Sequence, residues 1–234
     1  LGTRRPLGGC GCEEITHPPL SMAYNQVLGT STADNLIVGN VSGEDSITAL
    51  AGNDTVTGSG GKDIISLGSG NDLVTQPGAF TSGTVLGGTG NDTFFTASAL
   101  SGTSVNLDSG NDSILLNKSS TTITDSALSG GSNNDTISVV GTLGSGASVF
   151  GGAKGLAADG NDSIILTTVS SAFAQGNAGQ DTLNFIGSIA ANSSVKGGKD
   201  SDWIKAVSVD QAVVSGDAGN DTLQFTTGVV SQSS

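Results

Sequence analysis

Residues 87–95 read Gly-Gly-Thr-Gly-Asn-Asp-Thr-Phe-Phe, and variants of this nonapeptide recur along most of the chain. In each variant an aspartate is followed by one variable residue and then by an apolar residue. The tripeptide Gly-Asn-Asp is intact in the runs that begin at Gly52, Gly70, Gly90, Gly110, Gly160 and Gly219. Units this short cannot bury an apolar face alone, so their recurrence predicts coils that stack into a solenoid.

The spacing of the aspartates predicts two kinds of coil. Asp45, Asp54, Asp63 and Asp72 are nine residues apart. This interval predicts two units per coil, each a six-residue turn followed by a short strand. After Thr75 the intervals lie between 19 and 27 residues, so each coil then has one aspartate turn. Equivalent strands of successive coils would pair in parallel about 4.8 Å apart, in two sheets.

These intervals divide the chain into three parts. We expect a flexible N-terminal tail over residues 1–28, a nonapeptide-repeat roll over residues 29–75, and a continuing roll with coils of about 20 residues over residues 76–234. The chain ends inside a coil, which would suit a fragment of a longer protein. Amphipathic helices are disfavoured, because glycine is frequent and the apolar residues recur at nine or twenty residues.

The same phasing predicts which apolar residues point inward. Those two residues after each aspartate are Val56, Ile65, Val74, Phe94, Ile114, Ile137, Ile164, Leu183, Ile204 and Leu223. Counting back seven residues from each aspartate gives the opposite sheet: Val85, Val105, Leu128, Ala174, Val195 and Val214. Val149 joins the second set if residues 153–158 form an inserted bulge.

Composition and charge limit the partners. A formal net charge of −13 disfavours nucleic acid and anionic lipid and favours cations. There is no run of about 18 apolar residues, so no membrane span is predicted. Cys10, Cys12 and the single histidine, His17, precede the repeats. A mobile tail is the expectation there, because one Cys-x-Cys pair lacks the second ligand pair of a zinc site; a soft-metal site is the alternative.

Residues 87–95 match Gly-Gly-x-Gly-x-Asp-x-(apolar)-x at every position. The repeats thereby resemble the RTX, or hemolysin-type, calcium-binding family over most of residues 29–234. The resemblance implies an all-β, right-handed parallel β-roll that binds several Ca2+ ions between the turns of successive coils, along a single edge after Thr75. Carried over, its metal residues are Asp54, Asp63, Asp72, Asp92, Asp112, Asp135, Asp162, Asp181, Asp202, Asp221, Gly70, Gly90, Gly110, Gly160, Gly179 and Gly219, with Asp45 a weaker candidate.

The residue types give a physical reason for this chemistry. Glycine permits positive-φ bends that direct carbonyl oxygens toward one point, and aspartate adds a carboxylate there. The alternative is a calcium-free solenoid in which Asn-Asp turns satisfy their own backbone. It is strongest at residues 130–135, 176–181 and 197–202, where missing glycines should misplace the carbonyl ligands.

The function expected from these observations is structural. We predict a non-enzymatic calcium-binding extracellular protein, such as a surface-layer, sheath, filament or adhesin segment. His17 is the only histidine, so neither a His-Glu-x-x-His zinc site nor a Ser-His-Asp triad can be assembled. The resemblance implies type I secretion with folding in external calcium, and open strand edges favour self-association. The alternative is an ice- or carbohydrate-binding adhesin module that uses the flat outer face, where Asn recurs and Trp203 points outward.

Overall fold

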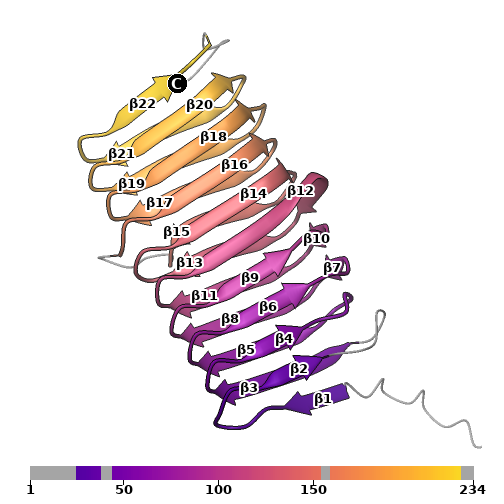
Figure 1. Cartoon of the computed structure of the whole chain (residues 1–234). Coiled ribbons are helices and arrows are strands. Elements are labelled where there is room, and N and C mark those ends of the chain that lie inside the picture. The colour runs from indigo at the N-terminus through magenta and orange to yellow at the C-terminus, as the bar shows by residue number, and fades with distance from the viewer. Residues whose placement is uncertain (1–24, 38–43, 154–158, 228–234) are drawn as a thin grey trace, which may run out of the picture.

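The computed structural model describes residues 25–37, 44–153 and 159–227. Within these ranges every helix or strand element is a β-strand, and the strands pair in parallel. The chain passes alternately through two sheets, and its coils stack in chain order (Figure 1). The predicted all-β parallel solenoid is therefore confirmed.

The first sheet takes one strand from each coil. Its strands, in order, are β1 (Asn25–Leu28), β3 (Asp45–Ala51), β5 (Ile64–Ser69), β8 (Thr84–Thr89), β11 (Ser104–Ser109), β13 (Ala127–Gly131), β15 (Ser148–Gly152), β17 (Phe173–Ala178), β19 (Ser194–Lys199) and β21 (Val213–Ala218). Residues 25–28, which the sequence places in the tail, thus form a strand that pairs with β3. The rest of the predicted tail, with Cys10 and Cys12, lies outside the described residues.

The second sheet follows the same order. Its main strands are β2 (Asn35–Ile37), β4 (Thr55–Thr57), β6 (Leu73–Gln76), β9 (Thr93–Thr96), β12 (Ser113–Thr124), β14 (Thr136–Leu143), β16 (Ser163–Val169), β18 (Thr182–Ile189), β20 (Trp203–Val209) and β22 (Thr222–Phe225). Two short strands, β7 (Phe80–Thr81) and β10 (Leu100–Ser101), pair with each other, and β10 pairs with the end of β12. Each main strand between the first and the last described coils is therefore paired with strands of the coils before and after it.

The strands of the first sheet extend into the predicted turns. β5 has six residues, and its pairing with β8 continues through Gly68 and Gly88. Both glycines have positive φ, which a residue without Cβ adopts at little cost. The turn itself is therefore shorter than the sequence predicts.

The predicted core is confirmed over most of its length. Nine of the predicted residues two positions after an aspartate are fully buried: Val56, Ile65, Val74, Phe94, Ile114, Ile137, Ile164, Leu183 and Ile204. On the opposite sheet Val149 pairs with Leu128 and with Ala174, as an insertion after it requires. Two predicted residues are exceptions: Val214 is only partly buried, and Leu223 is 41% exposed. Both lie in the last described coil, and no further described coil covers them.

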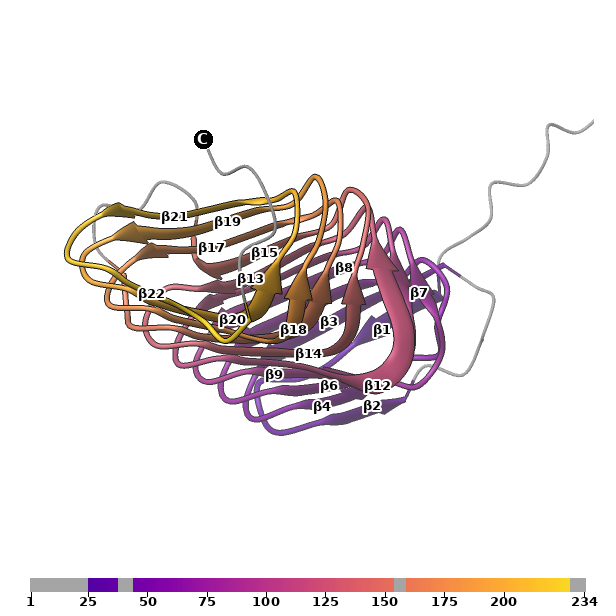
Figure 2. The ribbon, with the colours of Figure 1, turned by 90° about the horizontal axis from the view of Figure 1, so that it is seen from above.

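A short third side completes the core. β12, β14, β16, β18 and β20 continue past a register irregularity toward the edge opposite the Gly-Asn-Asp turns. Their last inward residues follow Phe80 and Leu100 in register and are buried: Ile123, Leu143, Val169, Ile189 and Val209. The sequence spacing predicted two sheets only and missed this apolar row. Figure 2 shows the two sheets converging at one edge and diverging toward the third side.

Candidate metal centre

The aspartates that follow the first-sheet strands form one continuous row, which we call the aspartate edge. Each backbone N–H donates to the Oδ1 of the aspartate one coil further on, over N–O distances of 2.7–3.0 Å. The row consists of Asp34, Asp54, Asp72, Asp92, Asp112, Asp135, Asp162, Asp181, Asp202 and Asp221. Stacking alone therefore uses one oxygen of each carboxylate.

The second oxygen of most of these carboxylates has no partner. The Oδ2 atoms of Asp54, Asp72, Asp92, Asp112, Asp135, Asp162, Asp181 and Asp202 are buried without a hydrogen bond. These eight side chains are at most 3% exposed. A buried carboxylate oxygen without a donor or cation is costly. The free Oδ2 atoms of this row therefore fit a bound cation. The backbone N–H groups bond to the Oδ1 atoms and leave Oδ2 available.

The first glycine of each turn leaves room for this free oxygen. Asp92 Oδ2 lies against Gly87, and Asp181 Oδ2 lies against Gly176. The same pairing recurs at Gly130, Gly151, Gly197 and Gly216 with the aspartates of their own turns. A Cβ at any of these glycines would overlap the carboxylate, so the missing side chain shapes the cavity in which the oxygen lies.

The six predicted metal-site glycines lie where successive coils come closest. A Cβ at Gly90 would overlap the carbonyl oxygen of Gly70, and φ at Gly90 is +118°. Gly70, Gly110, Gly179 and Gly219 repeat both features, and Gly160 repeats the close approach, against Asn133, without a positive φ in the left-handed range. Close packing of successive coils therefore requires glycine at these six positions. The carbonyl groups of each turn then lie close to the turn of the neighbouring coil.

The turns that depart from the glycine pattern keep the same backbone bend. Asn133, Asn177 and Asp200 stand where the pattern has glycine, and their φ angles are +81°, +89° and +71°. Asp108 and Asp217 behave in the same way. Asn and Asp tolerate the left-handed region better than other side chains. The bend of these turns therefore does not require glycine; the expectation that missing glycines misplace the carbonyl ligands stays a prediction.

Two of the aspartates lie at the other edge. Asp45 donates its N–H to Asp63 Oδ1 at 3.2 Å, and both side chains are fully buried. Nine-residue spacing with two units per coil places alternate aspartates on opposite edges. The structure thus divides the sequence-predicted set, with Asp63 beside Asp45 and the remaining nine aspartates on the aspartate edge.

Burial raises the pKa values of the aspartate edge. The pKa of Asp135 and of Asp181 rises to about 8, because the carboxylates are desolvated and face other carboxylates, while a backbone N–H lowers it in part. The pKa of Asp92 and Asp162 rises to about 7, and that of Asp112 and Asp202 to about 6, with burial again the largest cause. Without a cation, Asp135 and Asp181 therefore hold their protons at neutral pH, Asp92 and Asp162 are about half protonated, and Asp112 and Asp202 take up protons just below neutral pH.

The chemistry of the donors suits a hard cation. Among the described residues no three His, Cys, Asp or Glu side chains gather around one point. Any ion at the aspartate edge would thus combine carboxylate oxygens with several backbone carbonyls. Oxygen-only coordination with many carbonyls is the preference of Ca2+ rather than of zinc or copper.

An exposed row of asparagines runs beside the buried aspartates. The N–H of Asn71, Asn91, Asn111, Asn134 and Asn161 donates to the Oδ1 of the asparagine one coil before it. The row begins at Asn53 and continues to the N–H of Gln180. The recurring Asn is therefore explained by stacking, and it leaves each side-chain NH2 group facing outward.

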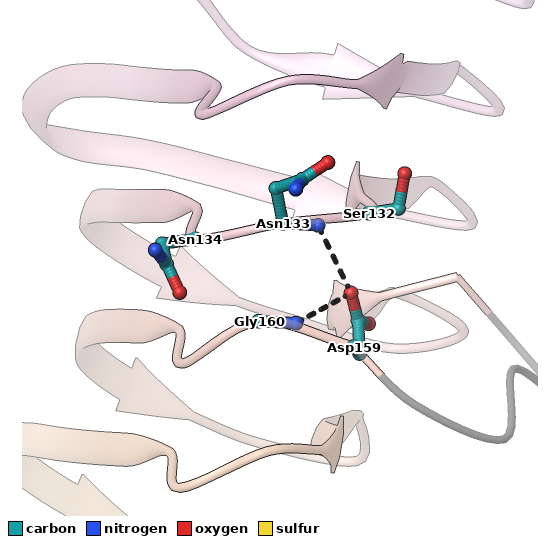
Figure 3. Close-up of a pocket in the computed structure, with 5 residues that line it drawn as sticks. All are labelled: Ser132, Asn133, Asn134, Asp159 and Gly160. Carbon is teal, nitrogen blue, oxygen red and sulfur yellow. Dashed lines mark hydrogen bonds between the residues drawn. The ribbon is translucent and has the colours of Figure 1, made fainter.

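One turn of the aspartate edge carries a surface pocket of about 270 Å3 (Figure 3). It is lined by Ser132, Asn133, Asn134, Asp159 and Gly160. Asp159 Oδ1 accepts from Gly160 N at 2.9 Å and from Asn133 N at 3.2 Å, and burial raises its pKa. The contacts tie this turn to the coil before it.

Comparison with known proteins agrees with this geometry. The model of the RTX calcium-binding nonapeptide repeat matches four copies, at residues 41–74, 81–98 and 213–224. No curated protein sequence gives a significant match. A solved structure, described as a hyperactive, Ca2+-dependent, beta-helical antifreeze protein from an Antarctic bacterium, aligns with a TM-score of 0.60 at 20% identity, over 88% of this chain and 77% of that chain. In the described ranges no helix is long and apolar enough to cross a membrane.

Proposed function

Because the chain carries four matches to the RTX calcium-binding nonapeptide repeat, we propose that it folds around Ca2+ ions along the aspartate edge and acts as a non-enzymatic extracellular structural protein. The row of buried Oδ2 atoms without hydrogen bonds carries the calcium assignment. The proposed ligands are the carboxylates of the sequence-predicted aspartates and carbonyl oxygens of their glycine turns. When bound, the ions supply positive charge between carboxylates that otherwise repel one another.

Folding and calcium binding are then one equilibrium. Each aspartate contacts the coil before it through Oδ1 and presents Oδ2 to its own turn, so an ion there links neighbouring coils. Binding that occurs only in the folded state stabilises that state by mass action. This coupling supports export in an unfolded form through a type I exporter and folding in external calcium, as a segment of a surface layer, sheath, filament or adhesin.

The test is a calcium titration of chelator-treated protein followed by far-ultraviolet circular dichroism. Magnesium is the control, and bound calcium is counted by equilibrium dialysis. A coil-to-sheet transition that requires calcium, with several ions bound per chain, supports the proposal. An unchanged sheet signal in chelator together with no calcium uptake overturns it, because apolar stacking would then suffice.

A second candidate is ice or carbohydrate binding by the outer surface. The observation that favours ice binding is the exposed asparagine row, which repeats in register from Asn53 to Asn161. Trp203, 45% exposed, is the corresponding candidate for a sugar contact. Thermal hysteresis measured in calcium tests ice binding. Thermal hysteresis that Asn91→Ala and Asn111→Ala abolish supports ice binding, and the absence of thermal hysteresis in the unsubstituted protein rejects it.

A further inference from the structure

On the edge opposite the aspartate edge, the position equivalent to Asp63 holds a carboxylate only in the first coils. The row that begins with Asp45 and Asp63 continues one coil later with Gly83 and then with Thr103, as the hydrogen bonds from Thr84 N to Asp63 O and from Ser104 N to Gly83 O show. Further on, the position is held by Ser126, Ala147, Ala172 and Ser193. Asp63 therefore has a carboxylate neighbour on one side and none on the other.

Gln76 fills the place beside Asp63 from the coil without a carboxylate. It ends β6, is 1% exposed, and neither its Oε1 nor its Nε2 has a hydrogen-bond partner. Its backbone carbonyl accepts from Thr96 Oγ1 at 2.7 Å, which fixes the chain at this point. A glutamine amide buried without partners is costly unless something absent from the polypeptide satisfies it.

The Gln76 amide takes the position that a free carboxylate oxygen takes elsewhere. In the turns of the aspartate edge, the first glycine lies against the Oδ2 of its own aspartate. In the turn that leads to Asp63, the first glycine is Gly58, and the group against it is the amide of Gln76. Burial raises the pKa of Asp63, and the nearby Gln76 amide lowers it in part, as an Nε2 group within reach of the carboxylate would, so the two side chains lie close together although no hydrogen bond of good geometry joins them.

Free carboxylate oxygens are buried on this edge as they are on the aspartate edge. Asp63 Oδ2 and both carboxylate oxygens of Asp45 are buried without hydrogen bonds. The turn itself bends through Gly60 and Gly61, whose φ angles are +96° and +94°. Gly61 N donates to Ala79 O of the following coil at 2.9 Å, so the two turns are closely packed around the site.

We propose that Asp45, Asp63 and Gln76 hold a divalent cation on this edge, with Gln76 Oε1 as the ligand that ends the row. The inference rests on the proposed calcium function and adds a ligand outside the nonapeptide pattern. A neutral amide supplies oxygen without charge, which suits the last site of a row where the next coil offers no carboxylate. The competing arrangement has Gln76 Nε2 donating to Asp63 with no ion present.

Glutamate and methionine at position 76 separate these arrangements. Gln76→Met keeps the volume and removes the oxygen, so the calcium-loaded protein should bind one ion fewer by equilibrium dialysis. Gln76→Glu adds charge to a ligand and should keep the ion with a lower calcium midpoint. If Nε2 were a donor to Asp63, Gln76→Glu would instead place two carboxylates together without a cation and raise the midpoint.

Two controls locate the effect. Leu116→Met makes a volume-conserving change at a buried position of the same inward row, two coils further on, and it should leave the ion count unchanged. Tb3+ luminescence excited through Trp203, the only tryptophan, reports the Asp202 turn and should be the same in every variant.

The outcomes distinguish the two proposals. A full ion count in Gln76→Met, with Asp92→Asn still losing calcium, overturns the Gln76 site and leaves the calcium function standing. No calcium uptake by the unsubstituted chain overturns both. If Gln76→Met fails to fold in calcium, Gln76→Glu decides: a retained ion supports the site and a lost ion rejects it.

Discussion

At the residue scale, each aspartate of the aspartate edge uses its two carboxylate oxygens differently. In the eight aspartates from Asp54 to Asp202, Oδ1 accepts the N–H of the previous coil, while Oδ2 is buried without a hydrogen bond. The first contact needs only an acceptor, whereas the second needs a cation or a proton. A substitution that keeps the acceptor and removes the charge therefore has effects of opposite sign with and without calcium.

Asp92→Asn tests this division of roles. In calcium we expect fewer bound ions and a raised calcium midpoint, because a charged ligand is lost. Without calcium at alkaline pH we expect greater stability than the unsubstituted protein, because a buried, repelled charge is gone. Equilibrium dialysis and urea unfolding measure the two effects. Asp210→Asn, at an exposed position, is the control; equal effects of both substitutions would contradict the assignment.

Gly90→Ala tests the close approach of successive coils. The new Cβ would combine a positive φ with overlap of the Gly70 carbonyl, so we expect a loss of about 1–3 kcal/mol or more in unfolding free energy. Gly102→Ala is the matched control. Gly102 also has a positive φ, but its Cβ would meet only Ser82 at 3.3 Å or more. Urea unfolding in saturating calcium should show the larger loss for Gly90→Ala, and equal losses would argue against coil contact.

The sequence identifies the aspartate edge but misses Gln76, for a physical reason. Asp92 and its equivalents recur at intervals that reveal their common environment. Gln76 occurs once, and its inward row otherwise includes Gly58, Thr96 and Leu116. Only burial without hydrogen bonds distinguishes it, and burial is a property of the stacked coils.

At the element scale, the aspartate edge behaves as a chain of coupled acids. The pKa of Asp135 is raised by burial and then by Asp162, Asp112 and Asp159. The pKa of this acid therefore depends on the charges of the aspartates in the coils before and after it. Proton and cation binding along the edge follow from the element as a whole rather than from one turn.

The pH dependence of the calcium-free protein follows from these shifts. The folded pKa values of about 6 to about 8 lie above the ordinary aspartate value of 3.8, so the folded state holds more protons than the unfolded state between about pH 4 and about pH 8. Stability should therefore be greatest below about pH 4 with respect to these groups and fall as the pH rises to about 8. Melting temperatures of dialysed, calcium-free protein measure this; a melting temperature that rises over that range would contradict it.

The elements themselves were predictable in part. The nine- and twenty-residue spacings predict the strands, the inward residues and the aspartate turns that lead into the second sheet. They do so because equivalent positions of successive coils stack on one another and need the same residue types. The third side was missed, since Leu100, Ile123 and Leu143 are separated by polar residues without a shared motif. Their common position appears only after the register irregularities of β12 and β14 are known.

At the scale of the whole molecule, the described stack ends in open strand edges. β1 and β2 form one end and β21 and β22 the other. Leu28 and Ile37, near the first end, are 71% and 69% exposed. Unpaired strand edges beside apolar side chains favour addition of another chain.

Self-association in calcium is the expected consequence. Sedimentation velocity should show an average mass that rises with protein concentration, and Leu28→Lys with Ile37→Lys should reduce that rise, because charge on an edge opposes pairing. Leu86→Lys, on the outer face in the middle of the first sheet, is the control. A monomer at every concentration would reject end-to-end association.

The pairing of each strand only with strands one coil away has a mechanical consequence. A chain held at both ends and pulled would give way at its terminal coil first and then coil by coil, since no strand bridges distant parts of the stack. With 18 to 27 residues between successive aspartates of the row, each rupture would release roughly 60–90 Å of extended chain. Force spectroscopy would then record a regular series of rupture steps, each at a higher force in calcium than in chelator. The molecule would act as a tether that lengthens under load before it breaks.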